Sequence, residues 1–218
     1  MALDLDTNKF KFIGGDISLD FVNTVSGRSG KADKNNTRDY QNLPGTEKIN
    51  DYADLLKWSV KAKLVGETAA HLLLQTAEKE PQAAEKVLRR ARDLRESVYR
   101  LFKSAIEGCE PEAEDLEKFN KELAAAWRHQ ILTWTEGDYH FQWIDAENAL
   151  NSMLWQIAES AAAMLVTGDL SRVRQCGGDD CGWLFLDTSR NRRRQWCDMK
   201  DCGNLAKIRR FRLKNSSI

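Results

Sequence analysis

The feature that most constrains this chain is a group of four cysteines in the arrangement Cys176-x4-Cys181-x15-Cys197-x4-Cys202. Two short-spaced pairs separated by a dozen or more residues are typical of a structural zinc site, because each short loop lets two thiolates converge on one ion. The spacing leaves two alternatives open, which are four unrelated buried cysteines and a redox pair. Neither pair has the CxxC spacing of a thiol oxidoreductase.

A zinc site with four thiolate ligands is structural and not catalytic. Four thiolates complete the tetrahedron around zinc, whereas a catalytic zinc keeps one position open for water. The three histidines of the chain, His71, His129 and His140, lie far from the cysteines in the sequence. We therefore expect a structural zinc ion and a protein that is not an enzyme.

The residues around the cysteines predict a small finger similar to a treble clef, made of a knuckle, a hairpin and a helix. Residues 183–187 alternate as a strand would, 189–192 are polar and predict a turn, and 193–196 can return as the second strand. The segment after Cys202 has helical apolar spacing and predicts a helix with an inward-facing side, formed by Leu205, Ile208 and Phe211.

The rest of the chain predicts an α+β fold that is mostly helical. Apolar residues recur at steps of three and four over much of residues 50–127 and again from Asp145 to Thr167. Strict alternation predicts a strand at residues 9–13 and a hairpin at 131–144. Because Gly168-Asp169 is a natural helix stop, we place the domain boundary there and predict domains at residues 1–168 and 169–218.

Charge is divided unequally between the two parts. Residues 171–218 contain 12 Lys and Arg and 5 Asp, a balance of +7, and the preceding residues carry a balance of −7. Such asymmetry indicates an anionic partner for the basic part, and nucleic acid is the obvious polyanion. The alternative is that this charge is a solvated face or docks on acidic protein surface. The candidate nucleic-acid-binding residues are Arg190, Arg192, Arg193, Arg194, Lys207, Arg209, Arg210 and Arg212.

Four tryptophans lie late in the helical part, Trp127, Trp134, Trp143 and Trp155. We interpret them as core residues, with a pocket for a small apolar effector as the alternative. A homodimer is a further expectation. No apolar run reaches the roughly 18 residues of a membrane span, and the N-terminus lacks a secretory signal pattern. We therefore expect a cytoplasmic protein without a membrane partner.

Two motifs resemble those of known families. Residues 174–204, RQCGGDDCGWLFLDTSRNRRRQWCDMKDCGN, closely resemble the CGNR zinc finger of bacterial proteins. Residues 14–24, GGDISLDFVNT, resemble the opening motif of the ABATE domain, described as a putative stress-induced transcription regulator. The resemblance implies a DNA-binding finger whose zinc ligands are Cys176, Cys181, Cys197 and Cys202. One position departs from the family pattern, because CGNR is CGNL here and Leu205 stands in place of the family's arginine.

The sequence therefore leads to two functional hypotheses. The first is a cytoplasmic transcription regulator whose helical part senses or assembles and whose zinc finger contacts DNA. The second is a zinc-stabilised protein-interaction module without a nucleic-acid role. Salt-dependent binding to DNA separates the two.

Overall fold

The computed structural model describes residues 7–28 and 47–215, which divide between two compact units. The first unit comprises Met1–Phe10 and Ile49–Gly168, and the second comprises Lys11–Lys48 and Asp169–Ile218. Both this grouping and the division expected from the sequence break the chain after Gly168. The predicted domains 1–168 and 169–218 stay a prediction.

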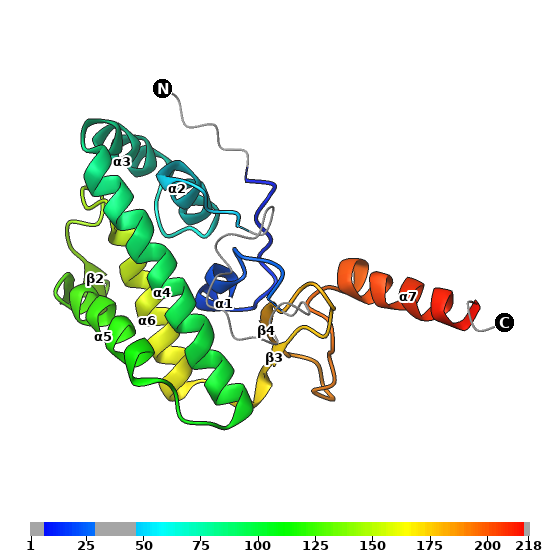
Figure 1. The fold of residues 1–218 in the computed structure, drawn as a ribbon. Helices are drawn as coiled ribbons and strands as arrows, with labels where there is room; N and C mark the ends of the chain where they lie inside the picture. Colours follow the sequence, from blue (N-terminus) through cyan, green and yellow to red (C-terminus); the bar gives the residue numbers. More distant parts are fainter. Residues whose placement is uncertain (1–6, 29–46, 216–218) are drawn as a thin grey trace. The chain divides into compact units, whose positions relative to one another are not determined.

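The first unit is a bundle of helices in which α4 is central (Figure 1). Helix α4 packs against each of the other four helices of the unit, and α5 also packs against α6. The helices are α2 (Tyr52–Lys61), α3 (Glu67–Lys79), α4 (Pro81–Glu107), α5 (Ala113–Trp127) and α6 (Ser152–Thr167).

Local signals in the sequence account for the long helix α4. Pro81 stands at its start, where a missing N–H costs nothing, and Gly108 ends it in the left-handed conformation with a φ of 68°. Of the expected apolar stripe, Val87, Ala91, Leu94, Val98 and Leu101 are buried, and Ala105 is half-buried. Helix α6 starts later than predicted, at Ser152, because Asp145 has a φ of 59°, which is not helical, and the chain then runs through turns and irregular structure over residues 146–151.

A hairpin interrupts the helices of this unit, as predicted. Strands β1 (Gln130–Thr135) and β2 (Asp138–Trp143) pair antiparallel, with Leu132 opposite Phe141 and Trp134 opposite Tyr139. Glu136 and Gly137 connect them with positive φ angles of 57° and 89°, the conformation that suits a two-residue hairpin loop.

The interpretation of the four tryptophans as one core cluster is wrong in part. Trp155 is buried on α6, and the ring of Trp143 lies 6.0 Å from it, centre to centre. Trp127 and Trp134 are exposed instead, with 57% and 59% of their surface accessible. Trp134 stands on a strand of the projecting hairpin, which periodicity alone could not place inside or outside the core.

The second unit contains a small sheet and several helical segments. Strands β3 (Val173–Gln175) and β4 (Leu184–Leu186) pair antiparallel, with Val173 opposite Leu186. Its described residues form α1 (Ile17–Val22), a short 3-10 turn at Leu170–Arg172, a π-helical turn at Met199–Gly203 and α7 (Asn204–Asn215).

Two strands predicted from the sequence, at residues 9–13 and 193–196, are not formed. The predicted strand at 183–187 therefore has another partner than expected. Residues 11–13 and 193–196 have no regular structure, and β4 pairs with β3. The segment 193–196 is held by other bonds: the Asp187 carboxylate accepts from the N–H of Arg194 at 2.9 Å, and the Gln195 carbonyl accepts from Gly177 at 2.9 Å. These bonds replace the expected strand ladder.

Residues of the N-terminal motif GGDISLDFVNT bind directly to β4. The side chain of Asn23 donates to the Leu184 carbonyl at 2.7 Å and accepts from the Leu184 N–H at 2.9 Å, as a neighbouring strand would. The Leu186 N–H donates to the Gly14 carbonyl at 2.7 Å. A Cβ at Gly14 would lie 2.8 Å from that of Leu19, so this close approach requires glycine. The motif is therefore part of the sheet's folding unit.

The predicted fold class is confirmed, since the chain is mostly helical with two small hairpins and a C-terminal four-cysteine cluster. Among the described residues, no helix is both long enough and apolar enough to cross a membrane.

The amide of Asn23 offers the first test of this packing. Asn23→Ala should lower the free energy of opening at β4 by about 2–4 kcal/mol, because it leaves a buried N–H and a buried carbonyl of Leu184 without partners. Hydrogen exchange of the β3 and β4 amides measures this energy. Asn204→Ala is the control, because Asn204 bonds one carbonyl at an exposed site and its loss should cost about 0.5 kcal/mol or less. Equal effects of the two changes would contradict the assignment.

Candidate metal centre and basic surface

The four cysteines of the predicted site converge. Their sulfur atoms all lie within 4.8 Å of one another, and Cys197 Sγ lies 3.6 Å from both Cys181 Sγ and Cys202 Sγ. Sulfurs at the corners of a tetrahedron with Zn–S bonds of about 2.3 Å are separated by about 3.8 Å. None of the four is in a disulfide. The cluster therefore fits a zinc ion.

Different elements bring these cysteines together. Cys176 follows β3, and Cys181 lies three residues before β4, so the first pair sits on the knuckle that joins the two strands. Cys197 follows the irregular segment, and Cys202 lies in the π-helical turn before α7. A Cβ at Gly178 would be 3.2 Å from Cys202 Sγ, so glycine at this position lets the knuckle approach the second pair.

Hydrogen bonds to sulfur favour thiolate at the centre. The Cys197 N–H donates to Cys176 Sγ at 3.3 Å. The neighbouring thiols of Cys181 and Cys197, together with this N–H and that of Gly178, lower the pKa of Cys176. The thiols of Cys176 and Cys181 raise the pKa of Cys197. Because four crowded thiols cannot all lose their protons without a cation between them, the arrangement requires a positive ion to reach the tetrathiolate form.

A small apolar cluster packs around two of the four cysteines of the metal centre. Trp183, Phe185, Cys176 and Cys197 are buried together, and Ile13 from the N-terminal segment packs against them. The Trp183 indole N–H donates at 2.8 Å to the carbonyl of Val25, a residue 158 positions earlier in the chain. The core of the finger thus includes residues that lie far from it in the sequence.

The basic loop after β4 is organised by one buried carboxylate. Asp187 accepts from the N–H groups of Ser189 and Arg194, each at 2.9 Å, and bonding with Ser189 lowers its pKa. The Arg194 guanidinium donates to the carbonyls of Trp196 and Cys197 and lies 4.5 Å from the ring centre of Phe185. Arg194 therefore braces the loop that presents Cys197.

The eight candidate nucleic-acid-binding residues differ in solvent exposure and in their contacts. Arg194 is half-buried and occupied by these bonds, whereas the other seven are exposed. Arg192 donates to the Ser171 hydroxyl and lies 3.4 Å from the Asp169 carboxylate. Arg209 forms ion pairs with Asp179 and Asp180 on the knuckle.

Three arginines of the loop line one depression together with an arginine that the sequence reasoning missed. The depression measures about 440 Å³, and Arg174 joins Arg192, Arg193 and Arg194 in its wall. Trp196, a glycine and two glutamines complete its lining. Arg174 stands on β3, outside the charge run, and only the folded structure, in which the Gly177 N–H donates to the Gln195 carbonyl at 2.9 Å, brings it to this depression.

Comparison with known families decides the identity of this architecture. The model of the ABATE family, described as a putative stress-induced transcription regulator, matches residues 15–168. That of the CGNR zinc finger matches residues 172–215. The chain belongs to the ABATE family. No curated protein matches it. Both resemblances seen in the sequence are confirmed, and the cofactor of this ABATE protein is a structural zinc ion held in its CGNR finger.

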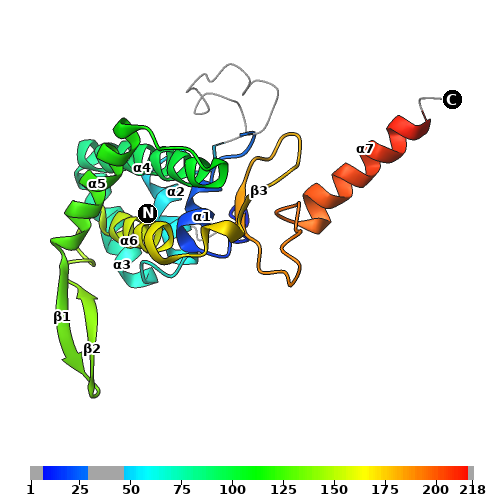
Figure 2. The ribbon, with the colours of Figure 1, turned by 90° about the horizontal axis from the view of Figure 1, so that it is seen from below.

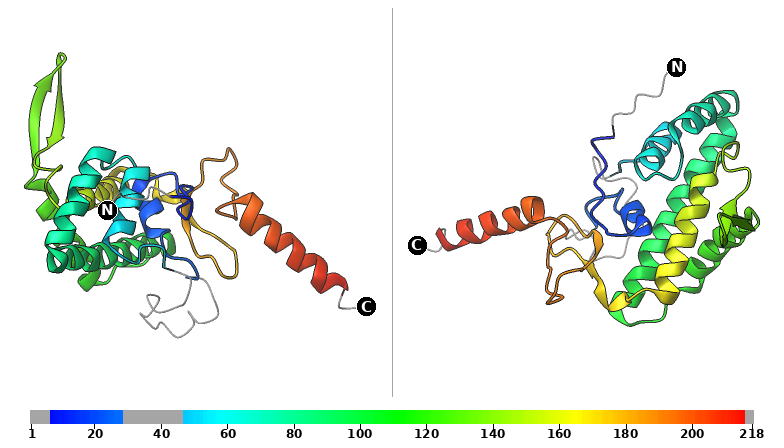
Figure 3. Two further views of the ribbon diagram at one scale, coloured as in Figure 1. Left: turned by 90° about the horizontal axis from the view of Figure 1, so that it is seen from above. Right: turned by 180° about the vertical axis from the view of Figure 1, so that it is seen from behind.

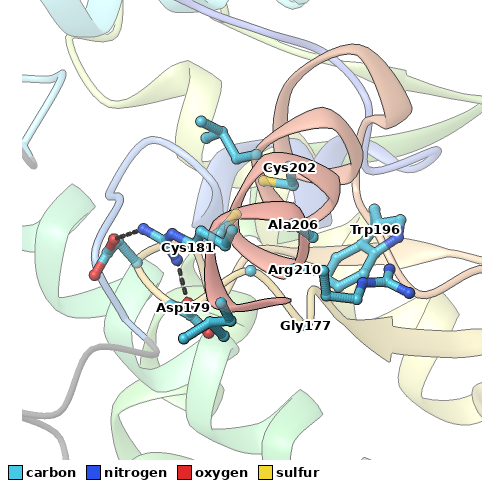
Figure 4. Close-up of a pocket in the computed structure, with 12 residues that line it drawn as sticks. Gly177, Asp179, Cys181, Trp196, Cys202, Ala206 and Arg210 are labelled. Carbon is cyan, nitrogen blue, oxygen red and sulfur yellow. Dashed lines mark hydrogen bonds and ion pairs between the residues drawn. The ribbon is translucent and has the colours of Figure 1, made fainter. Parts of the chain in front are cut away.

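The departure from the CGNR signature lies in a groove of about 350 Å³ between the knuckle and α7. Asp179 and Cys181 line one side and Ala206 and Arg210 another, with Trp196 nearby (Figure 4). Leu205 borders this groove and is 55% exposed. The expectation that α7 turns its apolar side inward is therefore wrong.

The other apolar residues of α7 are exposed as well, with accessible fractions of 47% at Ile208 and 66% at Phe211. Helix α7 continues beyond the β3–β4 sheet of its unit (Figure 3). Helical spacing identified the helix, but it cannot show whether another element covers its apolar residues.

Two side chains of the ABATE motif have structural tasks that the sequence left undecided. Asp16 caps α1 by accepting from the Ser18 N–H at 2.8 Å. Asp20 accepts from the N–H groups of Ile13 and Gly14, at 2.8 and 2.7 Å, and burial raises its pKa to about 6. Both residues fix the segment that binds β4.

Removal of the metal should unfold this unit as a whole. With a strong chelator we expect the amides of residues 173–203 and also of 17–28 to lose protection from hydrogen exchange, while α4 and α6 keep theirs. The reason is that zinc supplies on the order of 10 kcal/mol to the folding of small fingers. Exchange measured by mass spectrometry before and after chelation checks this.

Cysteine variants provide the matched control for that experiment. Cys181→Ser should abolish stoichiometric zinc binding, whereas Cys109→Ser should leave it unchanged, because Cys109 is exposed and outside the cluster. Loss of zinc without any change in exchange at residues 17–28 and 173–203 would contradict the prediction.

Proposed function

We propose that this ABATE protein is a transcription regulator in which Cys176, Cys181, Cys197 and Cys202 hold a structural zinc ion and the finger around them binds DNA. The observation that carries the proposal is the depression lined by four arginines. Guanidinium groups donate paired hydrogen bonds to phosphate oxygens, so clustered arginines suit the DNA backbone. The family description, a putative stress-induced transcription regulator, supports the regulatory role.

The zinc ion has an indirect part in this proposal. It fixes the knuckle and the loop 187–197, and the loop presents Arg192 and Arg193 at the rim of the depression. Arg194 positions that loop through its bonds to the carbonyls of Trp196 and Cys197. A phosphate contact would therefore depend on the metal without touching it.

Helix α7 adds a second basic surface. Lys207, Arg210 and Arg212 are exposed on it, whereas Arg209 is engaged by two aspartates. Contacts from these residues would add affinity without sequence preference, because they would meet phosphates and not base edges. The first unit would sense or assemble, and a small apolar effector for it stays a prediction, as do the cytoplasmic location and the absence of enzymatic activity.

The second candidate function is a protein-interaction module without a nucleic-acid role. The exposed apolar side chains of α7, Leu205, Ile208 and Phe211, favour it, because a polyanion has little use for them. The ion pairs of Arg209 and Arg192 with aspartates of the same unit also reduce the charge offered to DNA. The two functions differ in their response to salt.

Fluorescence anisotropy with a labelled DNA duplex between about 50 and 200 mM salt tests the DNA proposal. The logarithm of the affinity should fall linearly with the logarithm of the salt concentration, with a slope of about −0.9 for each phosphate contacted. Arg193→Ala should weaken binding at every salt concentration and reduce the slope by about 1, because it removes one such contact.

Arg89→Ala is the matched control, since Arg89 is an exposed arginine on α4 of the other unit. It should leave both affinity and slope unchanged. Arg193→Lys should keep most of the slope, because it retains the charge. Absent or salt-independent binding would refute the DNA proposal and leave the protein-interaction module as the better account.

A further inference from the structure

The β1–β2 hairpin of the first unit carries an apolar face that the proposed function does not use. Leu132, Trp134, Tyr139 and Phe141 are 60%, 59%, 66% and 66% exposed. The strand register places them on one face, because Leu132 is opposite Phe141 and Trp134 is opposite Tyr139. The rings of Trp134 and Tyr139 meet edge to face with centres 4.6 Å apart.

The hairpin projects away from the helices of its own unit, and no third strand joins it among the described residues (Figure 2). Its base is anchored, because Trp143 lies against Trp155 of α6 and Gln130 donates to Glu159 at 2.7 Å. Beyond this base the same face continues into solvent. An isolated two-stranded ribbon is marginally stable in water, so such a face is normally covered.

The opposite face of the hairpin is polar. It consists largely of Thr133, Thr135, Asp138, His140 and Gln142, with Ile131 near the base. Alternation of apolar and polar side chains is the pattern of a sheet with one covered face. Cross-strand pairs stabilise the ribbon itself, but they leave the outer surface of its aromatic side chains in water.

The charges near this face exclude several occupants. The four apolar residues include no charged group, and the tip carries Glu136 and Asp138. Phosphate backbones and anionic lipid surfaces are both repelled by an acidic tip. An uncharged face, by contrast, can meet its own copy across a twofold axis without placing like charges together.

The area also suits a dimer. Aromatic side chains bury roughly 150–250 Å² each. With about 60% of that exposed, the four residues offer on the order of 500 Å² in each copy, or about 1,000 Å² in two. Specific interfaces begin at about 1,200 Å² of total buried surface. Gln130 and Trp143, which lie on the same face and are partly exposed, can supply the remainder.

We propose that this hairpin is a dimerisation element, in which Leu132, Trp134, Tyr139 and Phe141 of one copy pack against the same residues of a second copy. The contact is isologous, so it closes at two copies. The dimer carries two zinc fingers, whether or not those fingers bind DNA.

Sedimentation of the full-length zinc-bound protein over a range of concentrations, with a thiol reductant to protect Cys109, tests the proposal. The wild type should pass from monomer to dimer as its concentration rises and form nothing larger. Leu132→Lys/Phe141→Glu should raise the dissociation constant about tenfold or more, because it places charges on the packed face.

The matched control is Thr133→Lys/His140→Glu. Thr133 is directly opposite His140, as Leu132 is opposite Phe141, so both variants place Lys on β1 across from Glu on β2. Only the face differs, and the control should dimerise as the wild type does. Trp134→Thr/Tyr139→Thr gives a second test that keeps β propensity high and preserves the hairpin.

Circular dichroism and zinc content verify that each variant is folded. The proposal is supported if dimerisation is lost both in the charged variant of Leu132 and Phe141 and in the double-threonine variant of Trp134 and Tyr139, and is kept in the control. A wild type that stays monomeric, growth into larger oligomers, or equal effects of the two charged variants would overturn it.

Discussion

The convergence of four thiols is the constraint on which the second unit depends. Its sheet has only three residues in each strand, and its buried cluster contains two cysteines beside Trp183 and Phe185. Small fingers of this kind draw much of their folding free energy from the bound metal. An ion bound by Cys176, Cys181, Cys197 and Cys202 closes several loops at one point, and the loop that displays the arginines is one of them.

Besides the metal, hydrogen bonds from the N-terminal segment hold this unit together. Asn23 completes the edge of β4 with two hydrogen bonds to Leu184, and Gly14 accepts from Leu186. Asn23 lies in the segment where the ABATE family match begins, at residue 15, and Gly14 directly precedes that match, so both are far from the finger in sequence. The motif GGDISLDFVNT stands at the start of the ABATE match. Its Asn23 side chain nevertheless takes the place of a neighbouring strand at the edge of β4 in the zinc finger. The motif's glycine allows the close approach of the backbone, and its asparagine pairs with the backbone of β4.

Sequence patterns predicted those features that follow from local spacing. Cysteine spacing located the metal cluster, periodicity located α4, and alternation located the β1–β2 hairpin. Patterns failed where a long-range partner decides the outcome. Leu184 and its neighbours read equally well as a strand beside 193–196 or beside 173–175, because alternation specifies a face and not a neighbour. Likewise the spacing of Leu205, Ile208 and Phe211 established a helix but not whether anything lies against it.

The same distinction applies to charge. A run of arginines in the sequence gives the total positive charge, but the structure shows that the single arginines make different contacts. Arg194 binds two carbonyls and an aromatic ring, and Arg209 binds two aspartates, while Arg193 stays exposed and lines a depression together with Arg174 of β3. Net charge therefore overstates the number of groups ready for phosphate. Leu205 removes one more cation from the family's signature, so any affinity for DNA must come from the loop and from α7 residues beyond that position.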